Sequence, residues 1–263
     1  MSDTEADAAV ERIALLARST ARATLLVELM RRRELRRREL AECVDVSRTT
    51  LQRNLDTLAA AGWVRRSGRT YRITTAGDAV ARSFEEFREV VEITERLSPF
   101  LRFVPREEFG ADVRCLADAD LLCADPPDPY AVRNRHVRAL KEMDECRMAV
   151  PFTGLHAQET LRDRIVGHGA RAELVVEPEV AETLRTKSRY ASLYDEMAAT
   201  GRYRVYVHEG PVRYGVALID DTAQFVAHEE YEPRALVETD DDDAVSWAAA
   251  AFAEYKREAT PLT

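Results

Sequence analysis

Apolar residues recur with helical spacing between residues 48 and 61. One stripe, spaced i, i+4 and i+7, consists of Leu51, Leu55 and Leu58. Ser47 precedes this segment as a favourable N-cap residue, and Gly62 follows it where helices commonly end in a left-handed residue. The pattern therefore predicts a helix over 48–61 with one core-facing side.

A shorter helix is predicted just before it, over 35–43. Its buried side is expected to carry Leu40, Ala41 and Cys43, and residues 44–46 form a tight connection to the next helix. Two helices joined in this way are typical of a helix-turn-helix, whose second helix enters the major groove of DNA. The alternative interpretation is an ordinary helical pair.

After these helices the apolar spacing changes to that of strands. The runs 63–66 and 69–74 flank Ser67 and Gly68, which form a turn signal, so they predict a hairpin. Its side chains available for burial are Val64, Tyr71 and Ile73, and those available for phosphate contact are Arg65, Arg66, Arg69 and Arg72. Such a hairpin would be the wing of a winged helix-turn-helix; an unrelated hairpin with solvated arginines is the alternative.

The face of the 48–61 helix opposite its leucines is polar, and its side chains can reach base edges or phosphates. The amino end of the helix also favours an anion. The residues expected to contact DNA, from this helix and the hairpin, are Ser47, Arg48, Thr49, Thr50, Gln52, Arg53, Arg65, Arg66 and Arg69. We therefore predict a DNA-binding domain over residues 1–74.

Charge is segregated along the chain. Residues 21–74 contain 13 arginines and 6 acidic residues, whereas the whole chain has a net charge of −9. DNA affinity depends on phosphate neutralisation, so a local basic face is needed even on an acidic protein. The arginines of 31–38 either flank the groove or form a solvated face that Glu34 and Glu39 partly compensate.

The use of basic residues bears on the environment of the protein. Only three of the 38 basic residues are lysines, and 47 residues are acidic. This composition indicates a halophilic protein in a salty cytosol, although high coding-GC bias also enriches arginine. In that environment salt weakens phosphate contacts, and base contacts must supply more of the affinity.

Three further helices surround the motif, over 6–17, 20–32 and 75–97. The last has two apolar stripes, which consist of Val80, Phe84, Phe87, Val91 and Thr94 on one side and of Val90, Ile93 and Leu97 on the other. A helix so widely apolar needs more than one neighbour, and we expect Phe84, Phe87 and Val91 to form a homodimer contact. The alternative is a buried helix that bridges to the next domain. Residues 75–110 are thus a connecting helix and a linker, with Pro99 ending the helix.

From residue 111 to 263 apolar strands alternate with helices. Strands are predicted over 120–124, 146–150, 172–176 and 202–207, with helices over 129–143, 154–168, 178–184 and 189–200 between them. This alternation predicts an α/β domain with a mostly parallel sheet. An antiparallel hairpin over 212–219 and 223–228 and a helix over 241–258 complete it. The fold class expected is an α+β winged helix-turn-helix, a connecting helix, and an α/β sensor-like domain.

Ligands of open parallel sheets lie beyond the carboxyl ends of the strands. The residues expected there as a small-molecule effector site are Thr153, Gly154, His156, Glu177, His208, Arg213 and Tyr214. Thr153 and Gly154 begin a helix and could hold an anion. The alternative is that these residues only cap helices and turn the chain.

Catalytic and metal-binding patterns are absent from the sequence. The five histidines stand singly, no nucleophile or phosphate-loop motif occurs, and the acidic run 240–243 cannot converge on one ion. We expect no enzyme, cofactor or metal. The four cysteines are expected to be reduced core thiols, with a redox sensor as the alternative. Without a long apolar run or a signal peptide, the protein is expected to be cytoplasmic and to bind no membrane.

Several segments carry a family resemblance. They are 46–55 (VSRTTLQRNL), 62–64 (GWV), 151–154 (PFTG), 242–247 (DDAVSW) and 252–255 (FAEY). With them the chain resembles archaeal winged-helix regulators that carry the middle domain named after the methanogenesis and filamentation regulator, a group similar to TrmB-type regulators. The resemblance implies transcriptional regulation, with a second domain that binds an effector or mediates assembly. It also suggests a phospholipase D-like fold, whose enzymes need a HxK signature that this chain lacks.

Two function classes follow. The first is a sequence-specific transcriptional regulator that reads double-stranded DNA as a homodimer. The second is an architectural or accessory DNA-associated protein whose acidic domain binds other proteins.

Overall fold

The computed structural model describes residues 3–107 and 109–262. The chain divides into two compact units between Val91 and Glu92, whereas the sequence predicted boundaries at 74 and 110. The difference arises because the expected linker carries core residues. Leu97 and Phe100 are fully buried in the second unit, and Ser98–Leu101 forms the short helix α6.

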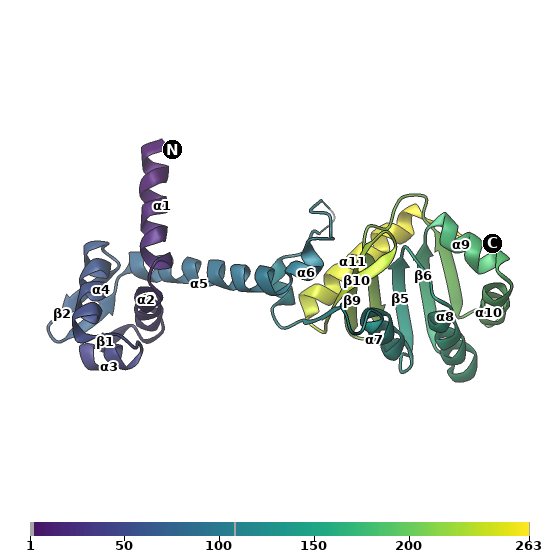
Figure 1. Ribbon diagram of the computed structural model, residues 1–263, viewed down its shortest axis with the longest axis horizontal. Helices are drawn as coiled ribbons and strands as arrows, with labels where there is room; N and C mark the ends of the chain where they lie inside the picture. The colour runs from purple at the N-terminus through teal and green to yellow at the C-terminus, as the bar shows by residue number, and fades with distance from the viewer. Residues whose placement is uncertain (1–2, 108, 263) are drawn as a thin grey trace. The chain divides into compact units, whose positions relative to one another are not determined.

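The first unit is a small helical domain with a three-stranded antiparallel sheet of order β1-β3-β2 (Figure 1). Its elements are α1 Asp3–Ala17, α2 Thr20–Arg32, β1 Glu34–Arg36, α3 Arg37–Glu42, α4 Arg48–Ala60, β2 Val64–Ser67 and β3 Thr70–Ile73, followed by α5 Thr75–Arg96, which crosses the boundary. Helix α4 and the hairpin of β2 and β3 lie where the sequence predicted a helix and a hairpin.

One prediction here was wrong. The helix expected over 35–43 is instead the strand β1 followed by the shorter helix α3. Leu35 is buried because it pairs with Tyr71 in the middle strand of the sheet. Ala41, expected on the buried side, is exposed. The sheet therefore has a third strand that closes one edge of the hairpin.

The second unit contains one eight-stranded sheet of order β11-β7-β6-β5-β8-β9-β10-β4. Its strands are β4 Asp120–Cys123, β5 Glu145–Val150, β6 Arg171–Val176, β7 Tyr203–Val207, β8 Gly215–Ile219, β9 Thr222–Glu229, β10 Glu232–Thr239 and β11 Thr260–Pro261. Its helices are α6, η1 Val113–Leu116, α7 Ala131–Leu140, α8 Leu155–Arg162, η2 Asp163–Gly167, α9 Pro178–Thr186, α10 Ser188–Ala198 and α11 Asp242–Glu258.

The expected mostly parallel sheet was wrong. Within the described residues only β5 with β6 and β6 with β7 pair in parallel, and the other five pairings are antiparallel. The reason is that helical crossovers end after β7. The chain returns through the hairpins β8–β9 and β9–β10, and β4 joins the far edge beside β10. The domain is therefore a mixed α/β sheet.

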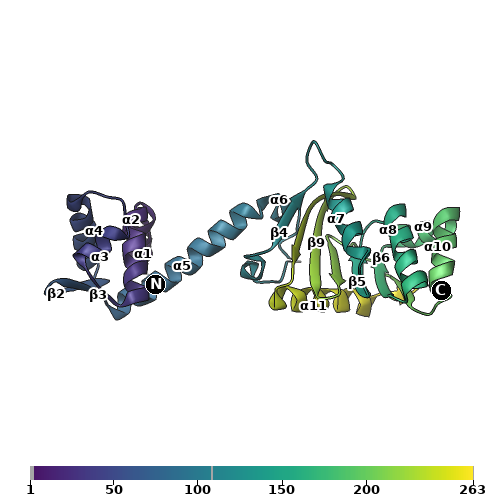
Figure 2. The same ribbon diagram turned by 90° about the horizontal axis from the view of Figure 1, so that it is seen from below.

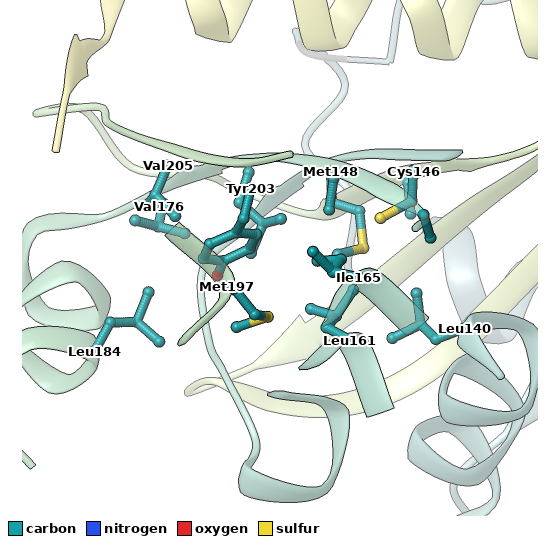
Figure 3. Packing of buried hydrophobic residues seen from close by; sticks show 14 of the residues in the cluster. Leu140, Cys146, Met148, Leu161, Ile165, Val176, Leu184, Met197, Tyr203 and Val205 are labelled. Carbon is teal, nitrogen blue, oxygen red and sulfur yellow. The ribbon is translucent and has the colours of Figure 1, made fainter. Parts of the chain in front are cut away.

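Helices cover both faces of this sheet. Figure 2 shows α11 along one face, and α7 to α10 on the other. Figure 3 shows the core on the second face, where sheet residues such as Met148 and Tyr203 meet helix residues such as Leu161 and Met197. In this layer α7 packs against β10 and β4 and lies beside α8.

Candidate functional site

The helix α4 is built as the sequence predicted. The Ser47 side chain accepts a hydrogen bond from the backbone N–H of Thr50 at 3.2 Å, and the two hydroxyl oxygens lie 2.9 Å apart. The three leucines of the stripe are buried. Gly62 ends the segment with φ of 78°, a left-handed value that glycine adopts at low cost. Ser47 and Thr50 thus serve first to cap the helix.

The opposite face of α4 is polar and open. Arg48, Thr49 and Arg53 are exposed. Gln52 is half-buried, and its amide nitrogen donates to Oδ1 of Asp56 at 2.8 Å and to the Tyr71 hydroxyl at 3.4 Å. These contacts hold Gln52 on the outer face of the helix. A side chain of any of these residues is long or polar enough to contact a base edge.

The hairpin extends this basic surface. Arg65, Arg66 and Arg69 are exposed around Gly68, which has φ of 60° at the turn. Arg66 Nε donates to the Gly68 carbonyl at 3.2 Å. Arg72, also expected to be available for phosphate, instead pairs with Glu34 at 3.0 Å. Strand β1, which the sequence prediction missed, supplies that carboxylate.

Carboxylates elsewhere in the first unit neutralise some of the arginines of residues 31–38. Arg31 and Arg32 pair with Glu28, and Arg33 pairs with Asp78 at 2.7 Å. In contrast, the arginines that enter no ion pair with a described residue include Arg48, Arg53, Arg65, Arg66 and Arg69. The exposed arginines of α4 and the hairpin are therefore available to an anion, as are Arg36 of β1 and Arg37 of α3, which are also exposed without an ion pair to a described residue.

The predicted dimer residues of α5 differ in exposure. Phe84 is half-buried against the core of the first unit. Phe87 and Val91 leave 59% and 37% of their surface exposed. On α1 two further apolar side chains are open to solvent, Val10 and Ile13. Phe84 of α5 thus packs into the core of the first unit, whereas Phe87 of α5 and Val10 and Ile13 of α1 are exposed.

The predicted effector residues do not form one site. Glu177 is buried and accepts a hydrogen bond from the Val212 N–H at 2.8 Å. His208 is buried, with Nδ1 2.8 Å from the Gly210 carbonyl. Tyr214 is buried against Trp247, and Arg213 is exposed. Glu177 and His208 therefore fix the chain between β7 and β8.

The other three predicted residues, Thr153, Gly154 and His156, border a cavity. It has a volume of about 500 Å³ and lies between the sheet and the helices α7 and α8. Its walls are mainly apolar, with side chains that include Val132, Val137, Leu140, Met148, Leu161 and Val226. Glu177, His208, Arg213 and Tyr214 do not line it. The cavity is in the size range of small-molecule sites.

Sequence reasoning missed a polar side chain of this cavity, His136 on α7. Nδ1 of His136 lies 2.8 Å from Oε1 of Gln224, whose amide nitrogen donates to Glu238 at 2.5 Å. Glu238 is also paired with Arg135. Burial lowers the pKa of His136. A signal existed, because His136 lies four residues from both Val132 and Leu140 on the apolar side of its helix.

The cysteines show no sign of activation. All four are free thiols, and burial is the main cause that raises the pKa of each, to about 11 for Cys115. A raised pKa disfavours the reactive thiolate. Among the residues that the structure describes, no group of three or more metal-ligating side chains occurs, and no helix is long and apolar enough to cross a bilayer.

Two family models match the chain. One, described as the HVO_A0261 N-terminal domain, matches residues 10–96, and the other, described as the middle domain of the methanogenesis regulatory protein FilR1, matches residues 129–258. The comparison with curated proteins gave no match.

Solved structures with a similar course of the chain include three of low sequence identity. TrmBL2, an archaeal chromatin protein with a novel mode of DNA binding, is 15% identical over 92% of this chain and 94% of its own, with a TM-score of 0.43. Nuc from Salmonella typhimurium, a phospholipase D family member, is 13% identical over 54% of this chain and 97% of its own, with a TM-score of 0.41. NucT from Helicobacter pylori is 14% identical over 54% and 98%, with a TM-score of 0.42.

Proposed function

Because the chain belongs to the archaeal TrmB-like regulators, with an HVO_A0261-type N-terminal domain and a FilR1-type middle domain, we propose that it is a sequence-specific transcriptional regulator. The observation that carries the proposal is the basic surface of α4 and the hairpin. There Arg48, Arg53, Arg65 and Arg69 are exposed and enter no ion pair with a described residue. The surface combines a polar helix face with a charged wing.

In the proposed complex, α4 lies in the major groove and reads base edges with Thr49, Gln52 and Arg53. Arg48 at the helix start and the arginines of the hairpin neutralise phosphates. Ser47 and Thr50 hold the amino end of α4 in position. We place this activity in the cytoplasm, where the chromosome of an archaeon lies. In this proposal the protein binds DNA and catalyses no reaction.

We also propose that the regulator is a homodimer. Phe87 and Val91 are the exposed apolar residues on α5, and a two-fold axis would let two α4 helices read a palindromic site.

Control by a small molecule bound to the second unit is the remaining part of the proposal. The cavity between the sheet and helices α7 and α8 supports it.

The specificity of the protein is tested first on the wild-type chain. A binding site selected from random DNA is expected to bind roughly 10³-fold or more tightly than scrambled DNA at matched salt. Fluorescence anisotropy with both duplexes measures the ratio. A flat profile across sequences would contradict a regulator and favour the architectural role.

Two substitutions then separate base reading from phosphate contact. Arg53→Ala is expected to lower the ratio of specific to scrambled affinity by about tenfold or more, because it removes a base contact. Arg69→Ala is expected to weaken both affinities alike and leave the ratio unchanged. The two variants lose the same charge, so each is the control of the other. Equal loss of preference in both would mean that α4 does not read the sequence.

The dimer is tested with Phe87→Glu. A charge placed on the open apolar face is expected to convert the protein to a monomer, since burying an unpaired carboxylate costs several kcal/mol (~3 or more). Sedimentation equilibrium measures the mass. Glu89→Gln, on an exposed position of the same helix, is the matched control and is expected to leave the dimer intact. A Phe87→Glu variant that keeps the wild-type mass would place the interface elsewhere.

A further inference from the structure

The hydrogen bonds around His136 define which tautomer its ring adopts. A carboxylate only accepts hydrogen bonds, so the contact with Glu238 orients the Gln224 side chain with its amide nitrogen toward Glu238. The amide oxygen of Gln224 then faces His136 at 2.8 Å. Because this oxygen is an acceptor, Nδ1 of His136 must donate the proton. In the neutral ring, Nε2 is therefore the acceptor.

The other ring nitrogen is available to a ligand. The His136 side chain lines the cavity, and its Nε2 has no hydrogen-bond partner among the described residues. Gln224, which fixes the ring, is fully buried. Burial lowers the pKa of His136, against the opposing effects of the hydrogen bond with Gln224 and the charge of Glu238, and this shift favours the neutral ring. Nε2 of His136 is thus a hydrogen-bond acceptor without a partner in the described part of the protein, in a cavity whose walls are mainly apolar.

The charges at the cavity do not favour an anion. Arg133 is the one arginine of its lining, and Nη2 of this side chain lies 2.6 Å from the Glu232 carboxylate, which also lines the cavity. An ionised ligand would have to displace that pair or remain uncompensated in an apolar space. Thr153 is engaged as well, because it accepts a hydrogen bond from Gln158 at 3.1 Å.

We propose that this cavity binds a neutral, mainly apolar molecule with one hydroxyl group, which donates a hydrogen bond to Nε2 of His136. The apolar body would lie against the side chains of α7, α8 and the sheet. Only the regulatory effect of this ligand rests on the proposed function; binding itself does not require DNA.

Isothermal titration calorimetry of the full chain tests the site with three probes of one ring system. Naphthol is expected to bind about tenfold more tightly than methoxynaphthalene, which has the same body but no donor. Naphthoate, which carries a negative charge, is expected to bind more weakly than both. Equal affinities of naphthol and methoxynaphthalene, tightest binding by naphthoate, or no binding of any probe would each overturn the proposal.

Three variants test whether the probes bind in this cavity beside His136. His136→Phe keeps an aromatic ring and removes the acceptor, so the advantage of naphthol should disappear. Ala157→Phe fills the cavity from α8 and should abolish binding of both neutral probes, which keeps the test valid if His136→Phe misfolds. His168→Phe, at an exposed histidine outside this cavity, is the matched control and should bind as the wild type does. Wild-type naphthol binding by Ala157→Phe would overturn the assignment.

DNA affinity is measured in parallel with and without naphthol. A changed affinity supports the molecule as an effector, and an unchanged affinity contradicts that role while the calorimetric result stands. Failure of the protein to bind DNA would contradict the proposed function and leave the cavity assignment decided by calorimetry alone.

Discussion

Replacing Gly77 by alanine is expected to lower the free energy of unfolding of the first unit by about 2 kcal/mol or more. A β-carbon at Gly77 would lie 2.0 Å from the Trp63 carbonyl oxygen. That oxygen is held in place because it accepts hydrogen bonds from the Thr74 N–H at 2.9 Å and from the Thr74 hydroxyl at 3.0 Å. The overlap is with backbone, so α5 or the hairpin must move.

The same substitution is expected to weaken DNA binding, since the hairpin that carries Arg65 and Arg69 begins directly after Trp63. Hydrogen exchange of the α4 and β2 amides measures the loss of stability, and the amides of the β5–β6 pair report on the second unit in the same sample. Gly154→Ala is the control. Its β-carbon would meet no atom within 4 Å, and Gly154 lies in the second unit, so the α4 and β2 amides should exchange as they do in the wild type. Wild-type exchange in Gly77→Ala would contradict the close approach.

The sequence was sufficient for α4 because everything that defines it is local. The cap at Ser47, the leucine stripe and Gly62 lie within one short segment. Strand β1 could not be predicted in this way. It has three residues, and Leu35 is buried only because Tyr71, far along the chain, pairs with it. The sequence also left open whether the arginines of residues 31–38 flank the DNA groove or are compensated by carboxylates. The structure was needed to decide this for Arg31 and Arg33, because Glu85 and Asp78, which pair with them, lie on a different helix.

The second unit shows the same dependence on distant partners. Alternation of strands and helices predicted the parallel pairs of β5, β6 and β7, and it failed where hairpins replace crossovers. The same change explains why the predicted effector residues do not form one site. Of the predicted effector residues, only those in and just after the loop that follows β5 border the cavity, whereas Glu177 and His208 are engaged with the backbone that leads into β8. His136 was missed because its partner Gln224 is on β9.

Raising the salt concentration from about 50 to about 200 mM is expected to weaken DNA binding by the dimer roughly ten-thousandfold. The arginines assigned to phosphates, Arg48, Arg65, Arg66 and Arg69, enter no ion pair with a described residue, and a dimer has two copies of each. Eight phosphate contacts predict a slope of about −7 in a plot of log affinity against log salt. The paired arginines should add little, because binding would first have to break their ion pairs.

Titrations of wild type and variants at five or more salt concentrations measure that slope. Arg69→Ala should make it shallower by about 2 per dimer, one contact being lost in each subunit. Arg33→Ala removes the same charge from a residue that pairs with Asp78 and should leave the slope unchanged. A shallower slope in Arg33→Ala would mean that the arginines of residues 31–38 also contact phosphate.

Added salt weakens phosphate contacts far more than base contacts. The DNA affinity that remains near molar salt should therefore depend chiefly on α4, and there Arg53→Ala should lower the affinity more than Arg69→Ala does.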